Sequence, residues 1–280
     1  MLVELAVGDA YGAGFEYADN PRPGHPQQAR YVQHPRHRGT RPGMYTDDTQ
    51  MSLAVAELLV EGARWTAENI AAKFVEVFHR DPRQGYAGGF YDFLCRTHSG
   101  EEFLANIRPD SDKSGAAMRA GPLGVLATPG SVLDRCRTQA ALTHNTPDGV
   151  HAAQAAALMT HYFLNDLGPK ERLGEFLEGL VPGPWSAPWA GKVGSKGWMS
   201  VRAAVTAVRR NTSLAALLQD CVAFTGDVDT VATMALAAAS CSREYEHDLP
   251  AALVEGLENG TYGRDYLVGL DRRLLAQGRG

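Results

Sequence analysis

The chain has 280 residues, of which 44% are hydrophobic and 21% are charged, and its formal net charge at pH 7 is -5. This composition is typical of a globular protein with a hydrophobic core and argues against a disordered chain. A slightly acidic chain without a long basic stripe lacks the charge pattern of a nucleic-acid-binding domain, so we expect no nucleic-acid partner.

The sequence shows no sign of export or of membrane insertion. No apolar run reaches the length that a membrane-spanning helix needs, and residues 1–7 lack the basic start of a signal peptide. Cys95, Cys136, Cys221 and Cys241 form no Cys-x-x-Cys pair and lie in or near apolar segments, so we expect buried free thiols. These features predict a reduced, cytoplasmic protein without a membrane partner.

Helical periodicity dominates the chain. Apolar residues recur at spacings of three and four, and alternating β patterns are scarce. Several segments are rich in alanine, which has a high helix propensity and allows close helix packing. The spacing predicts an all-α fold, with helices near 50–61, 66–80, 116–127, 131–142, 149–164, 199–210, 214–223, 229–241 and 249–257.

Two stretches interrupt this helical pattern. Residues 18–45 are rich in proline and glycine and predict a long loop, in which the basic residues 34–41 are interpreted as solvated. Residues 181–198 contain three prolines, four glycines and three tryptophans. This second stretch is either a linker between helical halves or a functional loop. Its tryptophans either cap the core or offer a stacking surface.

Two acidic clusters lie far apart, and each comes directly before a helical pattern. Residues 46–49 read Thr-Asp-Asp-Thr, and residues 226–230 read Gly-Asp-Val-Asp-Thr. One carboxylate at a helix start is favoured by the helix dipole and the free N–H groups, but a cap does not need two. Carboxylate and hydroxyl oxygens are good ligands for a hard cation such as Mg²⁺ or Mn²⁺. If the fold brings the clusters together, they form a metal-centred active site.

Three further motifs are weak signals when each is taken alone. Residues 8–16 read Gly-Asp-Ala-Tyr-Gly-Ala-Gly-Phe-Glu and end at Glu16, which a solvent-facing helix end would also explain. Residues 114–119 read Ser-Gly-Ala-Ala-Met-Arg, where the Ser-Gly pair either caps a helix or presents N–H groups to a phosphate. His144, in the Thr-His-Asn motif of residues 143–145, is either a packed histidine or a functional one.

Taken in chain order over residues 8–239, these motifs resemble the ADP-ribosylglycohydrolase family. The resemblance implies one domain over residues 1–280, built as a compact orthogonal multi-helix bundle with a central dinuclear metal site. It also implies two divalent metal ions, Mg²⁺ or Mn²⁺. By this resemblance, the metal ligands are Thr46, Asp47, Asp48, Asp227, Asp229 and Thr230.

The resemblance further implies what the site does. Glu16, with Asp47 and Asp48, forms the expected catalytic group. Ser111, Ser114, Gly115 and His144 are the expected substrate-binding residues, the first three near the diphosphate of ADP-ribose and His144 near the ribose. The implied reaction is hydrolysis at the anomeric carbon, which removes ADP-ribose from an ADP-ribosylated protein, with arginine as the expected acceptor. We expect a monomer.

Several alternatives stay open. The substrate is another ADP-ribose conjugate, of serine, a nucleic-acid base or a small molecule, or the chain is a metal-dependent phosphoester hydrolase. A third alternative is a non-catalytic relative that binds ADP-ribose or is structural. Such a relative would have lost some of the acidic residues, and here all are present. Asp110 and Asp112 depart from the family pattern near the diphosphate, where Lys113 is placed to offset them.

Overall fold

The computed structural model describes residues 1–18 and 29–277. Within these ranges the regular elements are helices, and β pairing is limited to isolated bridges, which confirms the predicted all-α class. None of the helices found there is long and apolar enough to cross a membrane. The helices are α1 (Leu2–Gly12), α2 (Asp47–Glu61), α3 (Ala67–Arg80), α4 (Gly88–Arg96), α5 (Gly100–Asn106), α6 (Gly115–Met118), η2 (Gly121–Val125), α7 (Pro129–Ala141), α8 (Pro147–Leu164), η3 (Lys170–Arg172), α9 (Leu173–Glu178), α10 (Gly197–Arg210), α11 (Leu214–Ala223), α12 (Val228–Ala239), α13 (Ala251–Gly256) and α14 (Arg264–Gln277).

The expected helix over 116–127 is wrong as a single element. The chain forms the short α6 and then the 3-10 helix η2, with Gly121 and Pro122 at the break. Proline has no N–H to donate and its ring clashes with the preceding turn, so an α-helix does not continue through it. The C-terminal α14 was missed, although Leu267, Leu270 and Leu274 form its buried stripe at helical spacing.

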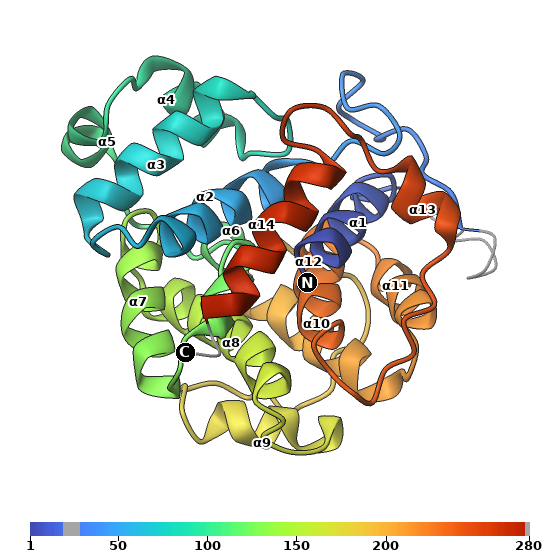
Figure 1. The fold of residues 1–280 in the computed structure, drawn as a ribbon. Helices are drawn as coiled ribbons and strands as arrows, with labels where there is room; N and C mark the ends of the chain where they lie inside the picture. Colours follow the sequence, from blue (N-terminus) through green and yellow to red (C-terminus); the bar gives the residue numbers. More distant parts are fainter. Residues whose placement is uncertain (19–28, 278–280) are drawn as a thin grey trace.

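Helix α12 lies at the centre of the molecule, beside α1 (Figure 1). All residues of α12 are buried, and most have small side chains. On α1, a Cβ at Gly8 would lie 2.6 Å from the Ala232 carbonyl oxygen, and one at Gly12 would lie 2.4 Å from the Asp229 Cα atom. Glycines one turn apart on one helix face therefore let the two backbones touch, at the place where the second acidic cluster begins.

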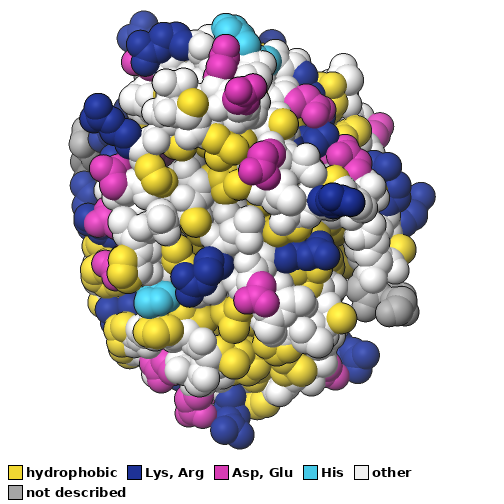
Figure 2. Space-filling model, turned by 90° about the vertical axis from the view of Figure 1, so that its left-hand side faces the viewer, with side chains coloured by type: hydrophobic (Ala, Val, Ile, Leu, Met, Phe, Trp, Pro, Cys, Tyr) yellow, Lys and Arg dark blue, Asp and Glu magenta, His cyan; other side chains and the backbone are white. Residues whose placement is uncertain are grey.

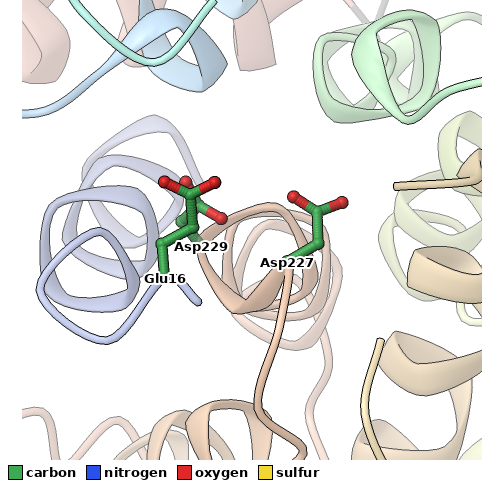
Figure 3. Close-up of side chains that lie close together, drawn as sticks. All are labelled: Glu16, Asp227 and Asp229. Carbon is green, nitrogen blue, oxygen red and sulfur yellow. The ribbon is translucent and has the colours of Figure 1, made fainter. Parts of the chain in front are cut away.

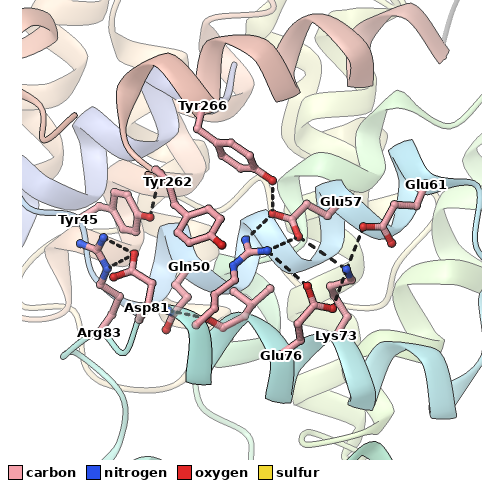
Figure 4. A network of polar contacts seen from close by, with 12 residues as sticks. Tyr45, Gln50, Glu57, Glu61, Lys73, Glu76, Asp81, Arg83, Tyr262 and Tyr266 are labelled. Atoms are coloured by element: carbon pink, nitrogen blue, oxygen red, sulfur yellow. Dashed lines mark hydrogen bonds and ion pairs between the residues drawn. The ribbon is translucent and has the colours of Figure 1, made fainter. Parts of the chain in front are cut away.

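Helix α14 crosses α2, and a buried polar network joins them to α3 (Figure 4). The Glu57 carboxylate, 4% exposed, accepts hydrogen bonds from Arg80 at 2.9 and 2.5 Å and from the Tyr266 hydroxyl at 2.7 Å. Lys73 bridges the same carboxylate to Glu61 on the outer side. Because a buried carboxylate needs such partners, the network fixes α14 to the helix that carries the first acidic cluster.

The two predicted irregular stretches are mostly free of helix. The loop expected over 18–45 falls partly outside the described residues, and its described part, 29–45, contains no helix. Residues 181–196 are irregular, but α10 already begins at Gly197 and includes Trp198. Trp185 is buried at 2% exposure and donates its indole N–H to the Val181 carbonyl, which is the position of a core cap.

The thiol prediction is wrong for one residue. All four cysteines are free, and Cys136 and Cys221 are buried as expected, whereas Cys241 is half-buried. Cys95 is exposed because α4 turns it away from the core. On the face drawn in Figure 2, basic and acidic side chains are interspersed and do not gather by sign.

Candidate active site

A cavity of about 1120 Å³ brings together residues from distant parts of the sequence. Ligand pockets typically measure about 300–1,000 Å³, so this cavity is large enough for a ligand of nucleotide size. All of the expected site residues except Thr46 line it: Glu16, Asp47, Asp48, Ser111, Ser114, Gly115, His144, Asp227, Asp229 and Thr230.

The second acidic cluster lies at the start of α12, where a tight turn aims it into the cavity. Gly226 has a φ of 90°, and a Cβ there would lie 1.9 Å from the Val193 carbonyl oxygen, so the turn requires glycine. The Asp227 N–H donates to the same Val193 carbonyl, and its carboxylate accepts from the Ser200 hydroxyl at 2.9 Å. These bonds fix both the backbone and the side chain of Asp227.

Glu16 joins this cluster from the segment after α1. The Tyr17 N–H donates to the Gly226 carbonyl at 2.9 Å, which ties that segment to the turn before α12. Glu16, Asp227 and Asp229 each offer a carboxylate oxygen, and the three oxygens lie within 4.8 Å of one another (Figure 3). This spacing is suitable for a shared cation.

The first acidic cluster is positioned by Asp9 of α1, a residue that the sequence analysis missed. Its buried carboxylate accepts hydrogen bonds from the N–H groups of Thr46 and Thr49, both at 2.9 Å, and from their hydroxyls at 2.7 and 2.6 Å. Asp9 thus caps α2 from another helix, which releases Asp47 and Asp48 from capping. An acid inside an otherwise apolar helix was the signal, because a buried carboxylate needs donors.

Thr46 itself does not line the cavity, and its hydroxyl donates a hydrogen bond to the Asp9 carboxylate. The link between the two clusters is made by Thr230, whose hydroxyl oxygen lies 3.3 and 3.4 Å from the two carboxylate oxygens of Asp48. The condition set by the sequence, that the fold bring both clusters to one place, is therefore met.

The carboxylates of both clusters are crowded in a buried position. Burial first, and then neighbouring carboxylates, raise the pKa of Asp47, Asp48 and Asp229 well above the ordinary value. The pKa of Asp227 rises to about 6 for the same reasons, with Glu16 as its main neighbour. One oxygen of Asp229 is buried and has no hydrogen-bond partner among the described residues. A divalent cation would coordinate this oxygen and reduce the repulsion between the carboxylates, so the residues fit a metal ion.

His34 is a second residue that the sequence analysis misjudged. It was interpreted as part of a solvated basic loop, yet it is 3% exposed. Its Nδ1 accepts the N–H groups of Arg36 and His37 at 3.1 and 3.2 Å, so the ring hydrogen is on Nε2. That nitrogen lies 3.1 Å from a Glu16 carboxylate oxygen. His34 therefore packs against the Glu16 carboxylate from the side of the loop, although the contact lacks hydrogen-bond geometry.

The segment before α6 forms another part of the cavity lining. The Ser114 N–H donates to the Ser195 carbonyl at 3.1 Å, and the Gly197 N–H donates to the Asp112 carbonyl at 3.1 Å. The Asp112 carboxylate forms an ion pair with Lys196, which lowers its pKa. This pair explains how an aspartate is accommodated where the sequence led us to expect conflict with a diphosphate.

Comparisons with known proteins agree with this fold. ADP-ribosylhydrolase ARH3 of Xenopus tropicalis is 31% identical over 144 residues, which are 48% of this chain and 41% of that protein. ADP-ribosylarginine hydrolase Tri1 of Pseudomonas putida (strain GB-1) is 24% identical over 196 residues, 65% of this chain and 51% of that protein. The chain thus spans about half the length of the curated relatives it matches.

Among solved structures, a chain titled "ADP-ribosylglycohydrolase-related protein complex" superposes with a TM-score of 0.75. The superposition covers 99% of this chain and 96% of the other at 24% identity, a level at which the likeness establishes the fold alone. The model of the family described as ADP-ribosylglycohydrolase matches residues 1–280. Since that match extends over the whole sequence, the chain belongs to the ADP-ribosylglycohydrolase family.

Proposed function

We propose that this protein is a metal-dependent hydrolase that removes ADP-ribose from an acceptor by cleaving the bond at the anomeric carbon. The observation that carries the proposal is the meeting of both acidic clusters and Glu16 at one cavity. The same cavity is also lined by Ser111, Ser114, Gly115 and His144, which are proposed to bind the substrate. The family and the names of the relatives support the same chemistry.

The proposed cofactors are two divalent ions, Mg²⁺ or Mn²⁺. Asp47, Asp48, Asp227, Asp229 and Thr230 would hold them, because their oxygens converge in the cavity. Thr46 would coordinate a metal ion only through a lone pair of its hydroxyl oxygen, because its hydroxyl hydrogen is donated to the Asp9 carboxylate. Bound divalent ions would orient the ribose hydroxyls and lower the pKa of a water molecule.

Glu16 is the proposed acid or base of the reaction, together with a carboxylate of Asp47 or Asp48 that is not fully used as a ligand. Glycoside cleavage passes through an oxocarbenium-like transition state, and a positioned carboxyl group protonates the leaving group or deprotonates the water. Glu16 suits this task because the Tyr17–Gly226 backbone bond places its segment beside Asp229 and the His34 ring packs against its carboxylate.

The proposed acceptor is arginine in a protein, because one of the relatives bears the name ADP-ribosylarginine hydrolase.

We propose a single domain, supported by the packing of α1 and α14, from the two ends of the sequence, against each other. Free cysteines support a reducing, cytoplasmic location. A monomer is supported by the scatter of exposed large apolar side chains over separate segments. In the described ranges these are Val32, Leu167, Leu180 and Val268.

The test is release of ADP-ribose from a protein carrying ADP-ribosyl-arginine, measured with Mg²⁺, with Mn²⁺ and with EDTA. We expect release that depends on metal and is lost in Asp229→Ala, while Asp134→Ala, an exposed aspartate of α7, keeps full activity. ADP-ribosyl-serine and a phosphodiester are assayed in parallel. Release that survives EDTA or the Asp229→Ala change contradicts the proposal, and cleavage of the phosphodiester alone favours a different hydrolase.

A further inference from the structure

Three buried side chains that line the cavity form a row of hydrogen bonds along its wall. Arg119 Nη2 donates to the Thr143 hydroxyl at 2.8 Å, and the Thr143 hydroxyl lies 2.7 Å from His144 Nδ1. Arg119 is 1% exposed, Thr143 is 5% and His144 is 6%. Of the three, Arg119 lies in the turn after α6, and the other two follow α7.

The Arg119 guanidinium, at one end of this row, is held in place by further contacts. The Gln139 side-chain oxygen accepts a hydrogen bond from Arg119 Nε at 2.6 Å, and the Gln139 main-chain carbonyl accepts one from Nη2 at 3.0 Å. The Gln139 amide donates in turn to the Ala116 carbonyl at 3.0 Å. The cation also lies 4.5 Å from the centre of the Phe74 ring. Arg119 therefore cannot turn away from Thr143 without breaking several contacts.

The chemistry of the three groups sets the direction of the hydrogen bonds. A guanidinium has donors only, so the Thr143 oxygen must accept from Arg119. The other side-chain partner of that hydroxyl in the described residues is His144 Nδ1. Donation of the hydroxyl hydrogen to Nδ1 is the arrangement that leaves this buried hydrogen paired, whereas a hydroxyl that accepted from both neighbours would leave it without an acceptor. Nδ1 then carries no hydrogen, and in a neutral imidazole the hydrogen must be on Nε2.

The Nε2 edge of His144 lies beside the segment expected to bind the diphosphate. A Cβ at Gly115 would lie 3.1 Å from His144 Cε1 and 3.3 Å from Nε2, so the ring packs against this glycine. Both residues line the cavity. The nitrogen that carries the hydrogen thus lies next to the backbone of Gly115.

We propose that Arg119, acting through Thr143, is a positioning residue that fixes His144 as the neutral tautomer with its hydrogen on Nε2. His144 then recognises an oxygen acceptor of the ligand, a hydroxyl or a phosphate oxygen, as an uncharged hydrogen-bond donor, and it does not take a proton from water. The identity of the ligand rests on the proposed function, whereas the tautomer does not.

The surroundings of His144 also favour the neutral imidazole over the charged form. Burial, followed by the nearby Arg119 guanidinium, lowers the pKa of His144 to about 3. Lys113 lowers it further, and only the Asp112 carboxylate opposes them. Asp112 is itself paired with Lys196, which weakens that opposition.

The test reads the tautomer from the ring nitrogens of the metal-free protein by ¹⁵N–¹H correlation at neutral pH, with His144→Gln used to assign the signals. We expect a single Nε2–H tautomer in the wild type and in Thr143→Ser, and loss of this single state in Thr143→Val. A wild-type His144 that is Nδ1–H or doubly protonated overturns the proposal, as does an unchanged tautomer in Thr143→Val. The wild-type spectrum decides even if Thr143→Val folds poorly.

A second measurement addresses the ligand. In Thr143→Val, ADP-ribose affinity in the presence of Mg²⁺ should fall roughly five- to tenfold, the loss expected for one hydrogen bond, and Thr143→Ser should restore it. Thr160→Val is the matched control, because the buried Thr160 hydroxyl has no partner in the described residues. An equal loss in Thr160→Val, or no loss in Thr143→Val, contradicts the donor role of His144. No binding by the wild type refutes the proposed function instead, and the tautomer is still decided by the spectra.

Discussion

Asp9 sets the direction of the Thr46 hydroxyl, although Asp9 itself does not line the cavity. One carboxylate oxygen of Asp9 accepts three hydrogen bonds, from the N–H groups of Thr46 and Thr49 and from the Thr49 hydroxyl. Within the described part of the chain, the other oxygen accepts one, from Thr46 Oγ1. An asparagine can keep the first oxygen as an acceptor and place its NH₂ group opposite Thr46. The Thr46 hydroxyl must then reverse and become an acceptor.

This reversal gives a prediction that separates orientation from folding. In Asp9→Asn we expect Mn²⁺ affinity to fall on the order of tenfold, because groups that orient metal ligands typically contribute that much. Thermal stability should stay close to that of the wild type, because most of the cap survives. Asp9→Ala removes the cap and should lower stability as well. Calorimetric titration with Mn²⁺ and thermal melts measure the two effects, and unchanged Mn²⁺ affinity in Asp9→Asn would refute this account of Thr46.

At the scale of elements, the contact between α1 and α12 positions the second acidic cluster. A Cβ at Gly12 would lie 2.4 Å from the Asp229 Cα atom, so the helices meet backbone to backbone at this point. Alanine is favoured over glycine inside a helix by up to about 1 kcal/mol, but overpacking a tight contact typically costs roughly 1–3 kcal/mol. For alanine at position 12, the packing cost should therefore exceed the gain in helix propensity.

We expect Gly12→Ala to lower the free energy of unfolding by about 1 kcal/mol or more and to weaken Mn²⁺ binding, because α12 must shift where Asp229 starts. Gly269→Ala in α14 is the matched control, since nothing lies within 4 Å of its added Cβ, and it should be neutral or stabilising. Denaturant melts and Mn²⁺ titration check both variants. Equal behaviour of the two variants would show that the α1–α12 contact tolerates a methyl group.

Sequence periodicity predicted most of the long helices, although not α14, and the order of motifs was sufficient to bring Asp48 and Asp229 to one site. Local pattern could not show which residues serve the acidic clusters from other elements. The contacts of Asp9 with Thr46, of His34 with Glu16 and of Arg119 with Thr143 join residues that only the packed fold brings together. A buried acid or histidine signals in sequence only that a partner exists, not which residue it is.

At the scale of the whole molecule, the acidic centre is a local weakness of the metal-free fold. The raised pKa values of Asp47, Asp48 and Asp229 show that burial and mutual repulsion oppose their charges. These carboxylates lie where α1, α2 and α12 meet, so their repulsion acts directly on the central packing of the bundle. A cation that binds only the folded state adds its binding free energy to stability.

We therefore expect Mg²⁺ or Mn²⁺ at a hundred times its Kd to stabilise the protein by about 2.7 kcal/mol, a rise in Tm of roughly 5 °C or more. Asp229→Asn should lose this rise, yet its metal-free form should be at least as stable as the wild type, because one of the crowded charges is gone. Asp134→Asn on the exposed side of α7 should keep the full rise. Thermal melts with and without EDTA decide the question: a rise retained in Asp229→Asn places the metal elsewhere, and a metal-free Asp229→Asn that melts lower than the wild type means that Asp229 supports the fold by contacts other than those to a cation.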